Sequence, residues 1–100
     1  MLQEKKDLKP MHIILYSKPG CHLCEGLQEK LEQVVETQDF AQLQLEIRDI
    51  TTRDDWFQAY QYEIPVLFIA DTRENQTKII PRPSPRVSWQ QLAQLLQKYI

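Results

Sequence analysis

The sequence predicts a single α/β domain in which helices flank a four-stranded mixed sheet. Three observations predict it. Some segments show apolar residues alternating with a period of two, and others repeat them at helical spacing. These segments follow one another in the order β-α-β-α-β-β-α, which is typical of a sheet with helices on both faces. The length of 100 residues, with 42% apolar and 26% charged residues, fits one globular domain.

The first half of the chain predicts a strand, a helix and a second strand. Residues 11–16 form a nearly continuous apolar run, as expected for a central strand buried on both faces. Pro19-Gly20 ends it with a turn. A helix starting at the first cysteine and running to about Gln38 follows, because one apolar stripe continues along it. Residues 43–47 then alternate between apolar and polar, which predicts a strand with one face on the core.

The middle of the chain predicts a short helix and a hairpin. Thr52 to Asp55 resembles a capping box, with Asp in place of the usual Glu or Gln, and it precedes the aromatic residues within 56–60. Residues 65–70 are rich in β-branched and aromatic side chains. The polar turn 71–76 then allows 77–80 to return as an antiparallel partner.

The chain closes with a helix whose start is marked by Ser88 and Gln91, the two positions of a capping box. Its apolar residues share one face, which predicts packing against the sheet. We interpret the large aromatic residues as core and helix-packing residues without a cofactor role: Trp56, Phe57, Tyr60 and Trp89.

Charge and composition exclude several function classes. A net charge of -2 and a pI near 5.6 provide no basic field for nucleic acid. Residues 1–10 are polar and charged, so we interpret them as a flexible lead-in to a domain at 11–100 and not as a secretory signal. No apolar run approaches the length of a membrane span. We therefore expect a soluble, cytoplasmic monomer that binds neither nucleic acid nor membranes.

The chain has two cysteines, Cys21 and Cys24, which are too few for a disulfide scaffold. In a reducing compartment this pair indicates redox or metal chemistry. The thiolate is the nucleophile of disulfide exchange, and the start of a helix stabilises an anion at Cys21. Cys24 lies one helical turn further on the same face, where it can act as the resolving thiol.

Three neighbouring residues are candidates for tuning or binding. Lys18 either adds positive charge near the thiolate or is a solvated lysine at a strand end, and the residues favour neither reading. His22 is interpreted as an exposed polar residue that tunes the thiolate, and not as a general base. It would add positive charge only when protonated, and histidine is mostly neutral at pH 7. Leu23 is interpreted as a surface or substrate-facing contact.

From residue physics alone, Pro65 is an ordinary trans proline, since only about 5 to 6% of X-Pro bonds are cis.

Two stretches carry a family resemblance. Residues 16–25, which contain the dithiol, resemble the active-site stretch of glutaredoxin-like proteins, and residues 62–67 resemble their cis-proline segment. The resemblance covers about residues 11–100 and implies a thioredoxin-like fold. It further implies that Cys21 is the nucleophile and Cys24 the resolving thiol.

The resemblance also implies a cis Ile64–Pro65 bond, which replaces the trans expectation. A cis bond at this position would leave the Ile64 backbone free to pair with an incoming peptide. In glutaredoxins the residues matching Lys18 and Ile64 help to hold glutathione, so a substrate-binding role is carried over to both. One departure is clear. Where glutaredoxins usually have a Gly-Gly turn, this chain has the proline-rich segment 81–86, in which Arg82 or Arg86 is a candidate to bind a carboxylate.

The sequence therefore predicts a thiol-disulfide oxidoreductase that reduces protein or glutathione-mixed disulfides. It predicts no bound cofactor or metal, with glutathione or a reductase as the electron donor. The alternative is a binding module in which the thiols hold zinc or an iron-sulfur cluster, or a fold that docks a partner. Zinc would need four ligands, for which the chain offers the two thiols with His22 and His12. A third reading is a structural fold with an idle dithiol.

Overall fold

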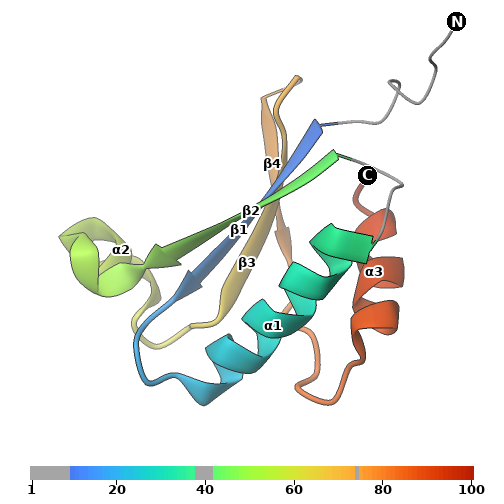
Figure 1. Ribbon diagram of the computed structural model, residues 1–100. Coiled ribbons are helices and arrows are strands. Elements are labelled where there is room, and N and C mark those ends of the chain that lie inside the picture. The colour runs from blue at the N-terminus through green and yellow to red at the C-terminus, as the bar shows by residue number, and fades with distance from the viewer. Residues whose placement is uncertain (1–9, 38–41, 74) are drawn as a thin grey trace, which may run out of the picture.

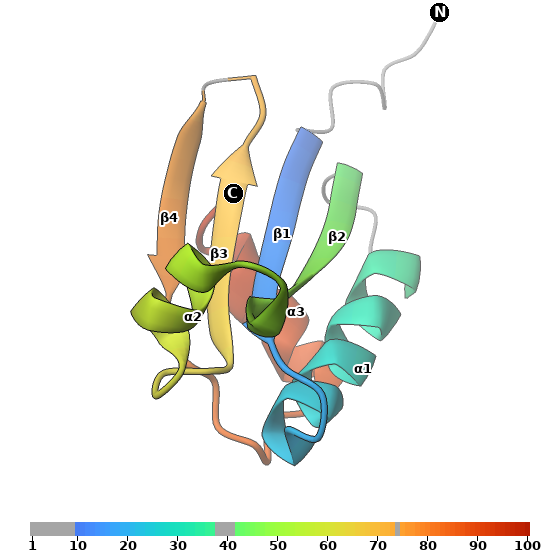
Figure 2. The ribbon, with the colours of Figure 1, turned by 90° about the vertical axis from the view of Figure 1, so that its left-hand side faces the viewer.

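The computed structural model describes residues 10–37, 42–73 and 75–100, and it has the predicted α/β architecture. Four strands form one sheet in the order β2-β1-β3-β4. Helices α1 (His22–Thr37) and α3 (Trp89–Gln97) cover one face, and the short α2 (Asp54–Tyr60) lies over one end of the other (Figure 1 and Figure 2). Residues 1–9 of the predicted lead-in lie outside the described residues, and Pro10 already begins the first strand.

Strand β1 (Pro10–Ser17) is the central strand that the sequence predicts, extended by one residue at each end. It pairs in parallel with β2 (Gln42–Asp49) and antiparallel with β3 (Val66–Asp71). Because strand residues alternate between faces, Ile13 points to the α1 and α3 side and Ile14 to the α2 side. Both side chains are buried, which explains why the sequence is apolar almost without interruption.

The hairpin is also confirmed. Strand β3 continues through a turn into β4 (Gln76–Ile80), with Leu67 opposite Ile80. Asn75 adopts a positive φ of 56° in this turn, a conformation that asparagine tolerates better than most residues. Strand β4 is an edge strand, and only Ile80 of its residues is buried.

Two clusters of side chains form the core, one on each face of the sheet. The larger cluster joins β1, β3 and β4 to the apolar stripes of α1 and α3, as the helical periodicity predicts. The smaller cluster lies under α2, where Trp56 and Tyr60 pack around the Tyr16 ring. Trp89 packs against the larger cluster, so all four aromatic residues have the packing roles predicted for them.

The capping box predicted at residues 52–55 is wrong. The N-cap of α2 is Arg53, whose side chain makes no capping hydrogen bond. Thr52 Oγ1 instead donates to the Asp49 carbonyl at 2.7 Å, and the Asp49 carboxylate accepts the Thr51 N–H at 2.9 Å. These bonds form a separate 3-10 turn, η2 (Ile50–Thr52), before the helix. The threonine therefore stabilises the preceding turn and not the helix that the pattern assigned to it.

The capping box of the last helix is confirmed. Ser88 Oγ accepts the Gln91 N–H at 3.1 Å, and Gln91 Oε1 accepts the Ser88 N–H at 3.0 Å. These bonds satisfy backbone donors that the first turn of a helix leaves unpaired. Within the described residues, no helix combines the length and apolar character that crossing a membrane requires.

Candidate active site

A tight turn after β1 presents the first cysteine. Gly20 adopts a φ of +82°, a conformation that glycine takes without steric cost. The Cys21 N–H then donates to the Lys18 carbonyl at 3.3 Å, which closes the turn. Lys18 itself is exposed. The local sequence Lys-Pro-Gly therefore places Cys21 at the junction between the central strand and the first helix.

Cys21 occupies the N-cap position of α1, since the helix begins at His22 and not at the cysteine itself. The Cys24 N–H donates to the Cys21 Sγ at 3.2 Å, and the Glu25 N–H donates to the Cys21 carbonyl at 3.0 Å. The sulfur therefore takes the place that a serine or aspartate oxygen takes in an ordinary helix cap. The positive end of a helix dipole is its N-terminus, so the positive end of the 16-residue α1 lies at this sulfur.

The two cysteines form a disulfide and differ in exposure. Their Cα atoms are 5.2 Å apart. Cys24 is only 1% exposed, because it belongs to the buried face of α1, whereas Cys21 is half-buried. A second molecule can therefore approach the sulfur of Cys21 more readily than that of Cys24. This difference fits the roles of nucleophile and resolving thiol.

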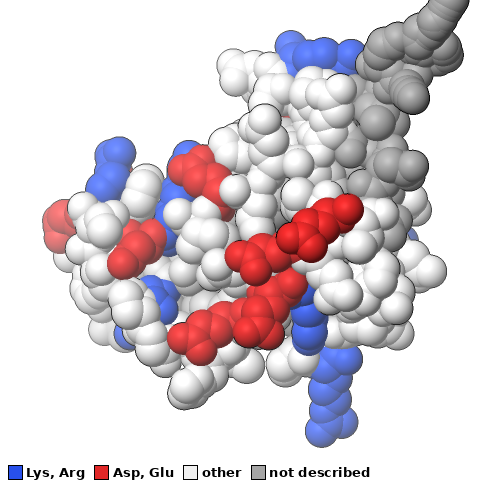
Figure 3. All heavy atoms as spheres, in the orientation of Figure 1, with Lys and Arg blue, Asp and Glu red and all other residues white. Residues whose placement is uncertain are grey.

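The residues between the cysteines face outward. The His22 side chain is 94% exposed, and its Nδ1 lies 3.4 Å from a carboxylate oxygen of Glu25. Leu23 is 52% exposed, consistent with its predicted surface position. Asp and Glu side chains gather over α1 (Figure 3), where every glutamate of the helix is exposed: Glu25, Glu29, Glu32 and Glu36. The outer side of this helix is therefore acidic.

The Ile64–Pro65 peptide bond is cis. Pro65 lines the same groove as His22 and Leu23, so the structure brings the proline beside the dithiol segment. The Ile64 N–H, however, donates to the Tyr60 carbonyl at 3.2 Å. The expectation that this backbone is free to pair with a peptide is therefore wrong for its N–H group. Pairing through that group would first require the bond to Tyr60 to open.

A groove of about 170 Å³ lies between α1, Pro65 and the proline-rich segment 81–86. Two side chains fix that segment in place. Arg82 Nη2 donates to the Glu63 carbonyl at 2.5 Å, and Lys30 Nζ donates to the Pro85 carbonyl at 2.8 Å. The groove is lined by His22, Leu23, Gly26, Leu27, Lys30, Pro65, Arg82, Pro83, Ser84 and Pro85.

The family model for the Glutaredoxin-like domain (DUF836) matches residues 12–97. The chain belongs to this family. The match includes both cysteines, Pro65 and all of α3, and therefore the whole site described above. Among curated proteins, no sequence matches this chain.

Solved structures show that this glutaredoxin-like domain has a thioredoxin-like fold. A malarial protein superposes with a TM-score of 0.63 at 12% identity, covering 90% of this chain and 97% of its own. Protein Ne2328 from Nitrosomonas europaea gives 0.61 at 21% identity, covering 100% and 99%. The first thioredoxin domain of mouse protein disulfide-isomerase A4 gives 0.59 at 13% identity, covering 90% and 63%.

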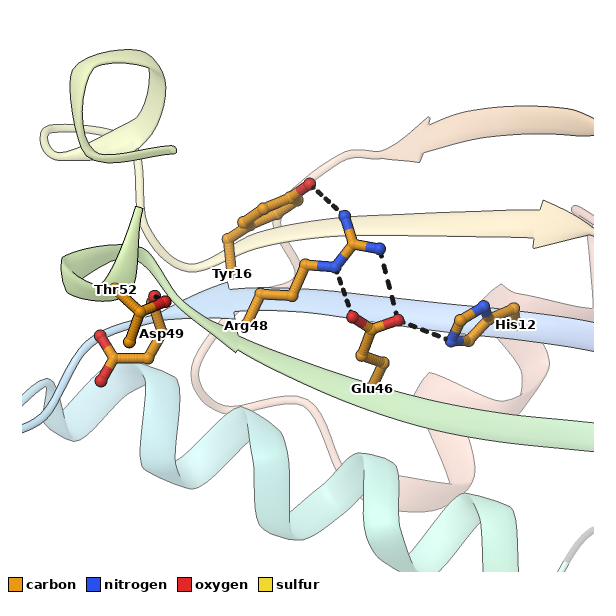
Figure 4. Close-up of polar contacts among 6 residues, drawn as sticks. All are labelled: His12, Tyr16, Glu46, Arg48, Asp49 and Thr52. Carbon is orange, nitrogen blue, oxygen red and sulfur yellow. Dashed lines mark hydrogen bonds and ion pairs between the residues drawn. The ribbon is translucent and has the colours of Figure 1, made fainter. Parts of the chain in front are cut away.

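His12 does not approach the dithiol of this glutaredoxin-like domain. It lies five residues before the end of β1, roughly 16 Å of strand from Ser17. Its Nε2 is 3.0 Å from Glu46, which also accepts two hydrogen bonds from Arg48 (Figure 4). These hydrogen bonds from Arg48 hold the pKa of Glu46 below its ordinary value. His12 is therefore not placed to join the two thiols and His22 in a zinc site, and the described residues bring together no group of three or more His, Cys, Asp or Glu around one point.

Sequence reasoning missed most of the groove. Arg82 was a candidate for binding a carboxylate, and the structure adds its hydrogen bond to the residue before Ile64. Lys30 and Leu27 look like ordinary surface and core positions of a helix. One signal was available: Gly26 lies inside a helix, where glycine is unfavourable.

Proposed function

We propose that this glutaredoxin-like domain is a thiol-disulfide oxidoreductase with Cys21 as its nucleophile and Cys24 as its resolving thiol. The observation that supports the proposal most is the position of the Cys21 sulfur. It is accessible, accepts a backbone N–H at the start of a 16-residue helix, and has the Cys24 sulfur directly behind it. Each of these features favours a thiolate that attacks and is then displaced.

In the reduced protein, the Cys21 thiolate attacks one sulfur of a substrate disulfide. A bond forms between Cys21 and that sulfur, the substrate disulfide breaks, and the other substrate sulfur leaves as a thiolate that takes a proton from water. Cys24 then loses its proton and attacks Cys21, which releases the second substrate thiol. With the proton that Cys21 gave to water when it ionised included in the count, two electrons and two protons pass from the dithiol to the substrate, and the protein is left with the Cys21–Cys24 disulfide.

The substrates we propose are protein disulfides or glutathione-mixed disulfides in the cytoplasm. We propose that the protein acts on them as a monomer. Glutathione or a reductase would return the two electrons, and no resident cofactor is required. Lys18, Ile64 and Pro65 would flank the substrate on the side of the strand ends, and His22 would tune the thiolate. The glutathione-binding role carried over to Ile64 would act through its carbonyl as long as its N–H remains bonded to Tyr60.

A mixed-disulfide trap tests the proposal. Cys24→Ser should attack disulfides but should not release the product, so that each protein molecule accumulates one substrate thiol on Cys21. Intact-mass measurement detects the adduct, and reduction with dithiothreitol should remove it. Cys21→Ser should collect no such adduct. Absence of an adduct on Cys24→Ser would contradict the proposal.

The same samples test the alternative of a metal-binding module. A dithiol that works by exchange should form and lose one internal disulfide reversibly, and the protein should stay colourless and metal-free. A stoichiometric content of zinc or of iron and sulfide in the reduced wild-type protein would favour the alternative.

A further inference from the structure

Gly26 is a glycine in the interior of α1 that the fold itself does not require. Glycine costs about 1 kcal/mol relative to alanine in the interior of a helix. Steric crowding does not require a glycine here, because a Cβ built on Gly26 would meet no atom within 4 Å. Its backbone conformation is not left-handed, unlike that of Gly20. What Gly26 does border is the groove beside the dithiol, which a side chain at this position would partly fill.

The groove has the size and lining of a pocket for one apolar side chain. A cavity of about 150 Å³ lined by apolar residues can hold benzene, so the groove volume of about 170 Å³ suits a side chain of leucine or phenylalanine size. Most of its exposed lining is apolar, with Leu23 and Leu27 on the helix side and prolines on the other. Proline lacks a backbone N–H, so Pro83 and Pro85 add no donors to that wall.

Two cations lie at this groove. Lys30 has three donors and Arg82 has five, and their hydrogen bonds to Pro85 and Glu63 each use one. The outer side of α1, in contrast, carries four exposed glutamates, and acidic side chains gather over this helix in Figure 3. A peptide lying in the groove would therefore meet positive charge on the side of the segment 81–86 and negative charge along the helix.

We infer that the substrate is a polypeptide whose disulfide-bonded cysteine has an apolar side chain within two residues and a carboxylate next to that side chain. The apolar side chain would occupy the groove beside Gly26, and the carboxylate would face Lys30 and Arg82. This inference rests on the proposed function, since it assigns the substrate class of the same dithiol. Glutathione carries carboxylates but no large apolar side chain, and would leave the groove empty.

Three synthetic peptides test the inference. Each has one cysteine in a disulfide with 2-mercaptoethanol, followed by Leu-Glu, Ser-Glu or Leu-Lys. The reduced wild-type protein, in excess over peptide in a single turnover, should reduce the Leu-Glu peptide with a second-order rate constant about tenfold higher than that for the Ser-Glu peptide. Filling an apolar pocket with one more side chain is worth at least about this factor. The Leu-Lys peptide should be about threefold slower than Leu-Glu, as expected for a partly exposed charge pair.

The variant Gly26→Leu should fill the groove and reduce the ratio of Leu-Glu to Ser-Glu rates to about one. Gly26→Ala, which also favours the helix, should give a ratio between that value and the wild-type ratio. The matched control is Gln33→Leu, which adds the same side chain at an exposed position of α1 outside the groove and should keep the wild-type ratio.

The outcomes separate the two proposals. If wild type reduces all three peptides at one rate, or reduces oxidised glutathione as fast as the Leu-Glu peptide, the inferred substrate class is overturned while the dithiol activity stands. A preference that survives in both Gly26 variants would also overturn it. If the wild-type protein reduces none of these disulfides, the proposed function itself fails.

Discussion

Serine in place of Cys21 is expected to lower the rate of disulfide exchange by a factor on the order of a thousand or more. A serine hydroxyl at this position stays protonated at pH 7 and cannot form the mixed disulfide, so the first bond of the reaction is lost. The rate should be measured as reduction of a small neutral disulfide under pseudo-first-order conditions. Replacing the nucleophile should also abolish the labelling of the protein by disulfide reagents at neutral pH.

The comparison with Cys24→Ser gives this prediction its control. That variant loses the resolving thiol but keeps the accessible sulfur and the backbone N–H that donates to it. It should therefore retain the first attack while losing turnover. An unchanged exchange rate in Cys21→Ser would mean that the dithiol is idle and that the fold serves another purpose.

Alanine in place of Leu31 is expected to lower the free energy of unfolding by about 2 to 5 kcal/mol. Leu31 is fully buried in the larger core cluster, on the stripe by which α1 packs against the sheet. Truncation removes buried methyl groups and leaves a cavity. The loss is a large part of the total stability of about 5 to 15 kcal/mol that small domains have. Urea denaturation of the reduced proteins measures it without a contribution from the disulfide.

Gln33→Ala, two residues along the same helix, is the matched control. Its side chain is exposed, so the free energy of unfolding should change by less than about 0.5 kcal/mol. A small effect of Leu31→Ala, similar to that of the control, would show that α1 does not depend on this contact for its position.

Elements whose burial is visible in the order of apolar residues could be predicted from the sequence. Strand β1 is buried on both faces and is a nearly continuous apolar run, whereas α1 and α3 each bury one stripe and repeat their apolar residues at helical spacing. The start of α2 could not be predicted in the same way. The side chain of Thr52 can bond to a turn or to a helix, and here it bonds to the backbone carbonyl of Asp49, which lies outside the capping-box pattern.

In the candidate site, too, the part formed by neighbouring residues could be predicted and the part formed by distant segments could not. Cys21 and Cys24 interact within one helical turn, so their spacing alone brings them together. The groove is built from α1, Pro65 and the segment 81–86, which are distant in the sequence and meet only through tertiary packing. The hydrogen bond from Arg82 to Glu63 and the engagement of the Ile64 N–H are contacts of this kind. No local sequence pattern predicts contacts between such distant segments.

The pH dependence of Cys21 alkylation tests the central claim most directly. In reduced Cys24→Ser, the rate of reaction with iodoacetamide should rise with pH around a midpoint between about 3.5 and 7.5, because the helix start stabilises the thiolate. A midpoint near 8.5, the value of free cysteine, would contradict the claim that this site lowers the pKa of Cys21 for exchange.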